Sequence, residues 1–177
     1  VECIDCGHRT GYSPTEHTCP ECGSYWREAR YDLASLAGKI PELVADRPFD
    51  LWRYRELLPI EHINPDLCIG EGGTPLIRAG NLGVMIGCPQ VYLKDERQGP
   101  TSSFKDRQAA ITVQALKEAG VHELVVASTG NVAISYSAYA ARAGIKIWAF
   151  LTSLVPAAKM REVAIYGTKV IKITGTY

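Results

Sequence analysis

The part of the chain after residue 105 alternates between continuous apolar runs and helix-like stretches, and this alternation constrains the fold more than any other feature. It predicts helices over 105–119, 131–142 and 156–166, and strands over 123–127, 145–151 and 168–173. Continuous apolar strands are expected where both faces of a sheet are covered, and helices of this length between strands build parallel βαβ units. The sequence therefore predicts an α/β fold with a parallel sheet.

The chain before residue 105 carries weaker signals of regular structure. We expect an amphipathic helix over 50–58, with Leu51, Tyr54 and Leu58 on its apolar face. A helical turn over 81–86 and a strand over 90–94 are also predicted.

Two Cys-x-x-Cys pairs, separated by twelve residues, lie near the N-terminus. They comprise Cys3, Cys6, Cys19 and Cys22. Four soft thiolate ligands with no open position are typical of structural zinc. Two reducible dithiols are the alternative, which the lack of a surrounding βαβ pattern disfavours. We therefore predict a small zinc-ribbon-like module over residues 1–28, a linker over 29–48 and a larger domain over 49–177.

Composition and charge exclude several classes of partner. Lysine plus arginine equals aspartate plus glutamate, at 19 each, so no overall field attracts nucleic acid or an acidic membrane surface. The ribbon has mixed charges and no basic and aromatic stripe, which also disfavours nucleic acid. No apolar run approaches the ~18 residues of a membrane span. We expect a reduced, cytoplasmic protein in which Cys68 and Cys88 are buried free thiols.

Lys105 opens the helix predicted over 105–119, directly after Gly99-Pro-Thr-Ser-Ser-Phe104. The helix macrodipole disfavours a cation in the first turn, so a lysine that stays charged gains nothing there. Burial and this dipole both lower the pKa of an amine, which makes a lysine nucleophilic toward carbonyls and able to act as a base. From the residues alone, a solvated lysine beside Asp106 is the alternative.

Three segments together resemble the pyridoxal-phosphate enzymes of fold type II, the tryptophan-synthase-β family. They are Ser103-Phe-Lys-Asp-Arg107 behind Pro100-Thr101, Glu71-Gly-Gly-Thr-Pro-Leu76, and Ser128-Thr-Gly-Asn131 with the helix after it. They occur in the family's order and at about its spacing, over residues 50–177. Lys-Asp-Arg is the version typical of threonine synthases. The resemblance thus identifies 49–177 as the N-terminal part of a catalytic domain.

The resemblance also implies roles for individual residues. Lys105 is implied to be catalytic and to form a Schiff base with pyridoxal phosphate, and Asn131 to hydrogen-bond the phenolic oxygen of this cofactor. The residues implied to hold the carboxylate of an amino-acid substrate are Ser128, Thr129 and Gly130. From the residues alone, a plain N-cap of the following helix explains the same segment equally well.

The glycine-rich segment Gly70-Glu-Gly-Gly-Thr74 invites interpretation as a phosphate-binding loop. Pro75 and a short apolar strand follow it, however, so the helix N-terminus of such a loop is missing. The family has a turn of this type at the edge of its active site. The resemblance therefore places Thr74 near the substrate.

The reaction implied is that of threonine synthase, in which O-phospho-L-homoserine and water give L-threonine and phosphate. Two other hypotheses remain. One is another lyase of the same fold, such as a threonine dehydratase, a diaminopropionate lyase or a cysteate synthase. The other is a non-enzymatic zinc-ribbon adaptor. The Lys-Asp-Arg sequence and the Glu-Gly-Gly-Thr-Pro turn favour threonine synthase.

In enzymes of this type the glycine-rich loop for the cofactor phosphate lies beyond the point that matches Tyr177. We therefore expect the chain to be the N-terminal portion of a longer enzyme, which by itself binds the cofactor weakly and does not turn over. We also expect an exposed apolar sheet edge and self-association, as a homodimer.

Overall fold

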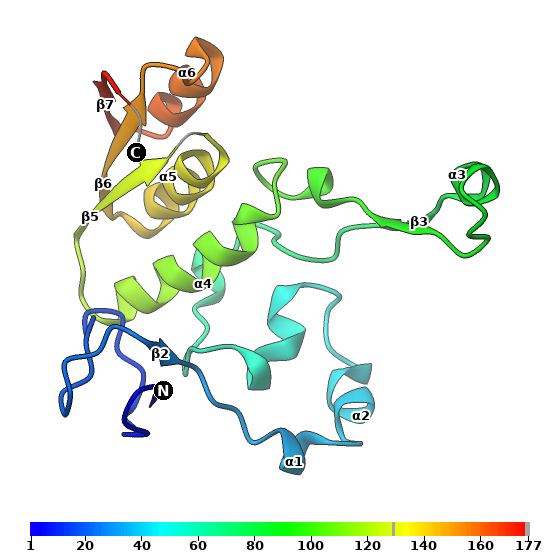
Figure 1. The fold of residues 1–177 in the computed structure, drawn as a ribbon. Helices are drawn as coiled ribbons and strands as arrows, with labels where there is room; N and C mark the ends of the chain where they lie inside the picture. The colour runs from blue at the N-terminus through cyan, green and yellow to red at the C-terminus, as the bar shows by residue number, and fades with distance from the viewer. Residues whose placement is uncertain (129, 176–177) are drawn as a thin grey trace.

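A parallel three-stranded sheet organises the computed structural model, which describes residues 1–128 and 130–175 (Figure 1). Its strands, in spatial order, are β5 (Glu123–Ser128), β6 (Lys146–Thr152) and β7 (Lys169–Ile173). The connecting helices are α5 (Asn131–Ala143) and α6 (Ala157–Ile165). Each element lies within one residue of its predicted bounds. The predicted parallel βαβ units are thereby confirmed.

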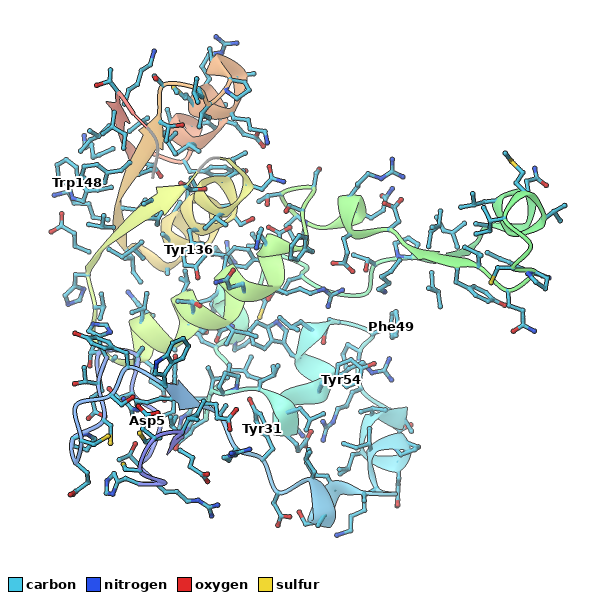
Figure 2. All side chains as sticks on the ribbon, in the orientation of Figure 1. Asp5, Tyr31, Phe49, Tyr54, Tyr136 and Trp148 are labelled. Carbon is cyan, nitrogen blue, oxygen red and sulfur yellow. The ribbon has the colours of Figure 1, made fainter. Side chains whose placement is uncertain are left out.

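Both connecting helices cover the same face of this sheet. The strand order runs in one direction, and right-handed crossovers then place successive helices on one side. On the other face Val125 is 65% exposed, and Trp148 points away from α5 (Figure 2). The prediction that both faces are covered is therefore wrong for residues 1–128 and 130–175, because the βαβ units supply helices to one face only.

Helix α4 (Lys105–Glu118) packs against α5 and completes the core. Small buried residues, Ala109 and Ala110 on α4 and Ala133 and Ala140 on α5, let the two helices approach closely. Tyr136 lies between them (Figure 2), and its hydroxyl donates to Thr112 Oγ1 at 3.1 Å. Helix α4 thus holds the segment before it, which contains the lysine motif, against the sheet domain.

The segment predicted as an amphipathic helix over 50–58 is instead a 3₁₀ helix, η1 (Leu51–Leu57), with non-helical backbone angles at Tyr54. Leu51 is buried within it, while Tyr54 is 39% exposed. The prediction of a regular helix is therefore wrong. Tertiary hydrogen bonds to residues outside the segment account for the irregular helix. Leu51 N donates to Glu71 O at 3.0 Å, and Arg53 Nη2 donates to Val44 O at 2.7 Å.

The glycines of the 70–74 turn are required by close backbone packing. Gly72 and Gly73 have φ values of +88° and +59°, which favour glycine. A Cβ at Gly72 would lie 2.2 Å from Leu51 N, and one at Gly73 would lie 2.3 Å from Phe49 O. The turn therefore fastens η1 to the body of the protein.

An arm over residues 74–95 projects from the body (Figure 1). It consists of β3 (Leu76–Arg78), the short helix α3 (Gly80–Met85) and β4 (Tyr92–Lys94), the strands pairing antiparallel. Val84 and Met85 at its tip are 80% and 83% exposed. Cys88, predicted to be buried, is exposed here because its apolar neighbours are exposed too, whereas Cys68 is half-buried. The arm then leads through η3 (Glu96–Gln98) toward α4.

The N-terminal thirty residues form a ribbon, and part of it, including Tyr12, lines a cavity together with residues of the 55–61 segment and Ala115. Its strands β1 (Glu2–Cys3) and β2 (Arg27–Glu28) pair antiparallel, and Arg27 binds Thr10 Oγ1 at 2.8 Å across it. The elements that follow are α1 (Leu33–Leu36) and α2 (Ile40–Ala45), and η2 (Pro65–Leu67) comes after η1. Within the described ranges, no hydrogen bond or salt bridge joins residues 1–30 to 49–175. No described helix is both long and apolar enough to span a membrane.

Candidate functional site

Lys105 is the first residue of α4, as predicted from the sequence. It is half-buried, and its ammonium lies 4.5 Å from the centre of the Phe104 ring. Ser102 has a φ of +54°, which few residues other than glycine adopt. The Lys105 N–H donates to Ser103 Oγ at 3.3 Å. The loop before α4 therefore turns sharply and presents the lysine at the start of the helix.

The segment between β5 and α5 lies at the carboxyl end of a parallel strand, where ligands bind in such sheets. Ser128 Oγ accepts hydrogen bonds from Gly130 N at 3.1 Å and Ala133 N at 3.2 Å. Ser128 therefore satisfies donors at the start of α5, the capping role that the sequence left open. Thr129, predicted to contact the substrate, lies outside the described residues. The substrate contacts predicted for Ser128 and Gly130 stay predictions.

Asn131 faces a positively charged side chain from the next helix. Lys159 Nζ, in the first turn of α6, donates to Asn131 Oδ1 at 2.9 Å. A Cβ at Gly130 would lie 3.0 Å from the same Lys159 nitrogen. Sequence reasoning missed Lys159. The available signal was its place in the first turn of α6, because consecutive helices of parallel βαβ units begin at the same edge of the sheet.

A cavity of about 560 Å³ joins these loops. It is lined by Asn131, by residues 102–104 directly before Lys105, by Ile77 and Leu93 of the arm, and by residues 94–97. This volume lies within the range of small-molecule sites. The structure thus brings Asn131 and the lysine loop to one cavity, while Lys105 itself follows directly on the lining residue Phe104.

Thr74 is buried and belongs to a partly buried polar network beside this cavity. Its hydroxyl donates to Glu96 Oε1 at 2.7 Å and accepts from Arg107 Nη2 at 3.2 Å. Arg107 also forms a two-pronged pair with Glu96, both N–O distances being 2.9 Å. These hydrogen bonds, from Arg107 above all, lower the pKa of Glu96. The network holds Arg107, which lies two positions after Lys105 on α4. The predicted place of Thr74 near a substrate stays a prediction.

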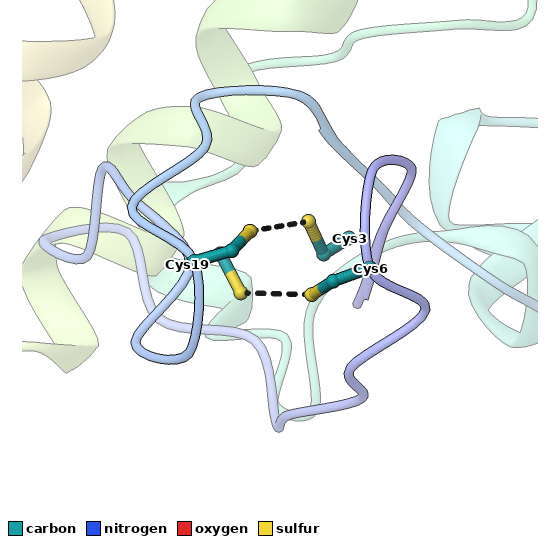
Figure 3. A group of neighbouring side chains, drawn as sticks. Cys3, Cys6 and Cys19 are labelled. Carbon is teal, nitrogen blue, oxygen red and sulfur yellow. Dashed lines mark hydrogen bonds between the residues drawn. The ribbon is translucent and has the colours of Figure 1, made fainter.

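The four paired cysteines converge in the ribbon (Figure 3). Their sulfurs all lie within 4.8 Å of one another, and the Cys3–Cys22 and Cys6–Cys19 pairs are each 3.6 Å apart. Sulfurs around a tetrahedral zinc ion, with Zn–S bonds of about 2.3 Å, are about 3.8 Å apart. The donor set and its spacing therefore fit one zinc ion.

The pKa values of two of these thiols are shifted in opposite directions. The backbone N–H groups of Cys6 and Asp5 donate to the Cys3 sulfur and hold the pKa of Cys3 at about 7. For Cys6 the backbone N–H of His8 acts in the same direction, but the Cys22 sulfur and burial outweigh it and raise the pKa of Cys6 to about 12. Several thiolates cannot share so small a space unless a positive ion compensates them.

Known proteins are similar to this chain in sequence and in fold. The family model for pyridoxal-phosphate dependent enzymes matches residues 67–177. The threonine synthase of Methanocaldococcus jannaschii is 37% identical over 177 residues, covering 99% of this chain and 43% of the relative. That of Methanosarcina acetivorans is 33% identical over 178 residues, covering 100% and 43%. The processed form of threonine deaminase isoform 2 from Solanum lycopersicum superimposes with a TM-score of 0.52, at 25% identity, over 58% of this chain and 28% of that one. The chain thus spans 43% of the length of these two threonine synthases.

Proposed function

The chain belongs to the pyridoxal-phosphate-dependent enzymes, and we propose that it carries the lysine-bearing portion of a threonine synthase active site. The reaction would convert O-phospho-L-homoserine and water to L-threonine and phosphate. The two threonine synthases that match the full chain support this assignment. The observation that carries it is that Asn131, to which the Lys159 ammonium donates a hydrogen bond, lines one cavity together with the loop before Lys105.

The residues around this cavity fit pyridoxal phosphate. The cavity is large enough for a small molecule, and Asn131, which lines it, offers an amide. Bound pyridoxal phosphate supplies an electron sink for negative charge at the substrate Cα. In this proposal Lys105 would hold the cofactor through its amine before the substrate binds. Once the substrate amine has taken its place, the released Lys105 amine would move protons at Cα and Cβ of the substrate, and Asn131 would hydrogen-bond the cofactor's phenolic oxygen.

The substrate would be an amino acid that carries a second anionic group. We propose that Ser128, Thr129 and Gly130 hold its carboxylate, because α5 begins here and N–H groups at a helix start favour anions. Thr74 would lie at the edge of the same site. Lys159 adds a cation beside Asn131, which suits a phosphate ester better than an uncharged side chain.

A second candidate is a lyase that acts on an unphosphorylated substrate. The similarity to a threonine deaminase favours it, and Lys105 and Asn131 would serve that reaction as well. Such an enzyme has no substrate phosphate for Lys159 to bind. Diaminopropionate lyase and cysteate synthase chemistry belong to the same group of alternatives.

Ligand discrimination tests the assignment. Calorimetric titration in the presence of pyridoxal phosphate compares O-phospho-L-homoserine, L-homoserine and L-threonine. We expect the phosphorylated ligand to bind at least about tenfold more tightly, because a charge-assisted hydrogen bond contributes this much. Equal affinities, or a preference for L-threonine, would favour the second candidate. Where turnover is measurable, L-threonine and phosphate should appear in equal amounts. A non-enzymatic adaptor predicts instead that Lys105→Ala changes nothing.

We also propose that Cys3, Cys6, Cys19 and Cys22 hold one structural zinc ion. Residues 1–28 would then be a zinc-ribbon module, joined by the linker 29–48 to the N-terminal part of a catalytic domain over 49–177. In the ribbon the buried apolar side chains are two of the cysteines, Cys3 and Cys19. So small a core does not fold alone, and metal binding would supply the missing stability. A cytoplasmic location and a homodimer remain predictions.

A further inference from the structure

The lysine-bearing loop is tied to α5 by a chain of partly buried hydrogen bonds. Thr101 N donates to Asp106 Oδ2 at 2.9 Å, and the Thr101 hydroxyl bonds to Asp106 Oδ1. The same hydroxyl lies 2.8 Å from Ser135 Oγ. Because Asp106 is a carboxylate that only accepts, the Thr101 hydroxyl donates to it and accepts from Ser135. The order of donation is therefore Ser135 to Thr101 to Asp106.

The carboxylate at the end of this chain is enclosed. Asp106 is 2% exposed and Ser135 is fully buried. A Cβ at Gly99 would lie 2.8 Å from Asp106 Oδ2, so the loop backbone also closes over this carboxylate. In the described part of the chain no lysine or arginine forms a salt bridge with Asp106. A buried carboxylate without a cation is unfavourable unless its oxygens accept hydrogen bonds. Here Thr101 alone donates two hydrogen bonds to Asp106.

The geometry points to Asp106, Thr101 and Ser135 as a clamp that positions Lys105 relative to Asn131. Asp106 is the neighbour of Lys105 at the start of α4. Ser135 lies four residues after Asn131 on α5, and residues at this spacing share one face of a helix. The clamp therefore connects the helix turn that carries the lysine to the helix turn that carries the asparagine.

The role of this clamp in catalysis rests on the proposed function, whereas the clamp itself rests on the contacts described above. None of its three residues lines the cavity, so they act through Lys105 rather than on a substrate. Asp106→Asn keeps the size of the side chain but leaves one acceptor oxygen for two donors. It should release one of the two bonds from Thr101 and loosen the loop over 99–105.

A matched control lies two residues further along α5. Ser137 is also fully buried, and it accepts a hydrogen bond from the Thr168 hydroxyl at 2.7 Å. Ser137→Ala therefore removes an equally buried serine hydroxyl, and its hydrogen bond with Thr168, from the same helix without touching the lysine loop. The test variants are Asp106→Asn, Thr101→Val and Ser135→Ala. Thr101→Ser retains the hydroxyl and should restore wild-type behaviour.

Two measurements that need no cofactor decide the proposal. Amide hydrogen exchange reports the opening of the 99–106 segment, and trace acetylation with acetic anhydride reports the reactivity of Lys105 relative to the other lysines. In Asp106→Asn and Thr101→Val, which each lose a hydrogen bond to the charged Asp106 carboxylate, we expect the amide of residue 101 to exchange at least about tenfold faster. In Ser135→Ala, which loses a bond between two hydroxyls, we expect a smaller increase. We expect the relative acetylation of Lys105 to change with it. Ser137→Ala and Thr101→Ser should leave both values as in the wild type.

The clamp is refuted if the test variants keep the Lys105 reactivity of the wild type, or if Ser137→Ala changes it equally. Should one test variant fail to fold, the Lys105 reactivity of the other two is compared with that of Ser137→Ala, and the same decision follows. Trapping of pyridoxal phosphate with borohydride is run in parallel. An unlabelled Lys105 in the wild type would count against the proposed function, while exchange and acetylation would still decide the clamp.

Discussion

The ammonium of Lys159 donates a hydrogen bond to the side-chain oxygen of Asn131 at 2.9 Å, joining the first turn of α6 to the first turn of α5. A positive charge therefore stands at the edge of the sheet where the candidate cavity opens. Within the described ranges, Lys159 forms no salt bridge with a carboxylate.

Replacement of Lys159 by methionine should weaken anion binding and leave the fold intact. We expect the affinity for O-phospho-L-homoserine to fall by about ten- to a hundredfold, because a charge-assisted hydrogen bond is lost. Calorimetric titration measures the change. Lys169→Met, an exposed lysine on β7, is the control and should bind as the wild type does. If Lys159→Met binds O-phospho-L-homoserine as tightly as the wild type does, the proposal that the substrate carries a phosphate is contradicted.

Glu71 should be a large contributor to stability. It is 1% exposed and accepts hydrogen bonds from Trp52 Nε1 at 2.6 Å, Tyr139 Oη at 2.9 Å and Ile69 N at 2.9 Å. Glu71→Ala leaves the buried Tyr139 hydroxyl and the partly buried donors of Trp52 and Ile69 unsatisfied, which we expect to lower the free energy of unfolding by about 3 kcal/mol. Urea denaturation measures this value.

The matched control for Glu71 is Glu123→Ala. Glu123 is half exposed and pairs with Lys146 at the sheet surface, and an exposed pair contributes little. If both variants lose the same small amount of stability, Glu71 does not fasten the 69–74 turn to α5 as described.

Zinc removal should unfold the ribbon and spare the sheet domain, because no hydrogen bond or salt bridge of the described residues connects the two. We expect one equivalent of zinc in the purified protein, lost in Cys3→Ser and Cys19→Ser. Hydrogen exchange should then show residues 1–28 fully open after chelation. Cys88→Ser, an exposed cysteine outside the cluster, should retain the metal. Absence of zinc from protein purified without chelators, with the ribbon still protected, would contradict the assignment.

Acid should weaken the pairing of Arg47 with Glu56, which links the segment after α2 to η1. Two hydrogen bonds, at 2.6 and 2.7 Å, lower the pKa of Glu56 from 4.5 to about 2. Because the folded state binds this proton less readily, the stabilisation is complete above about pH 4.5 and is lost as the pH falls toward about 2. Urea denaturation across this window should show a smaller loss in Glu56→Gln than in the wild type. Equal losses would show that the pair does not contribute.

Local sequence patterns predicted the sheet domain well and the remote contacts poorly. Apolar runs and helical periodicity located α4 to β7 within one residue, and the cysteine spacing located the sulfur cluster. The open sheet face, the 3₁₀ form of η1 and the exposure of Cys88 depend on which elements pack where, which periodicity does not report. Lys159 and Ser135 escaped notice for the same reason, since each acquires its role from a partner about thirty residues away. The functions of the site residues remain predictions.

The central claim is that this chain prepares Lys105 to react with pyridoxal phosphate. The direct measurement is to add the cofactor in excess, reduce with borohydride and map the modified peptides, because reduction captures even weak binding irreversibly. We predict one pyridoxyl group, on Lys105, which is absent in Lys105→Ala and retained in Lys117→Ala on the same helix. Labelling scattered over surface lysines, or none at Lys105, would contradict the claim that these 177 residues hold a prepared lysine site.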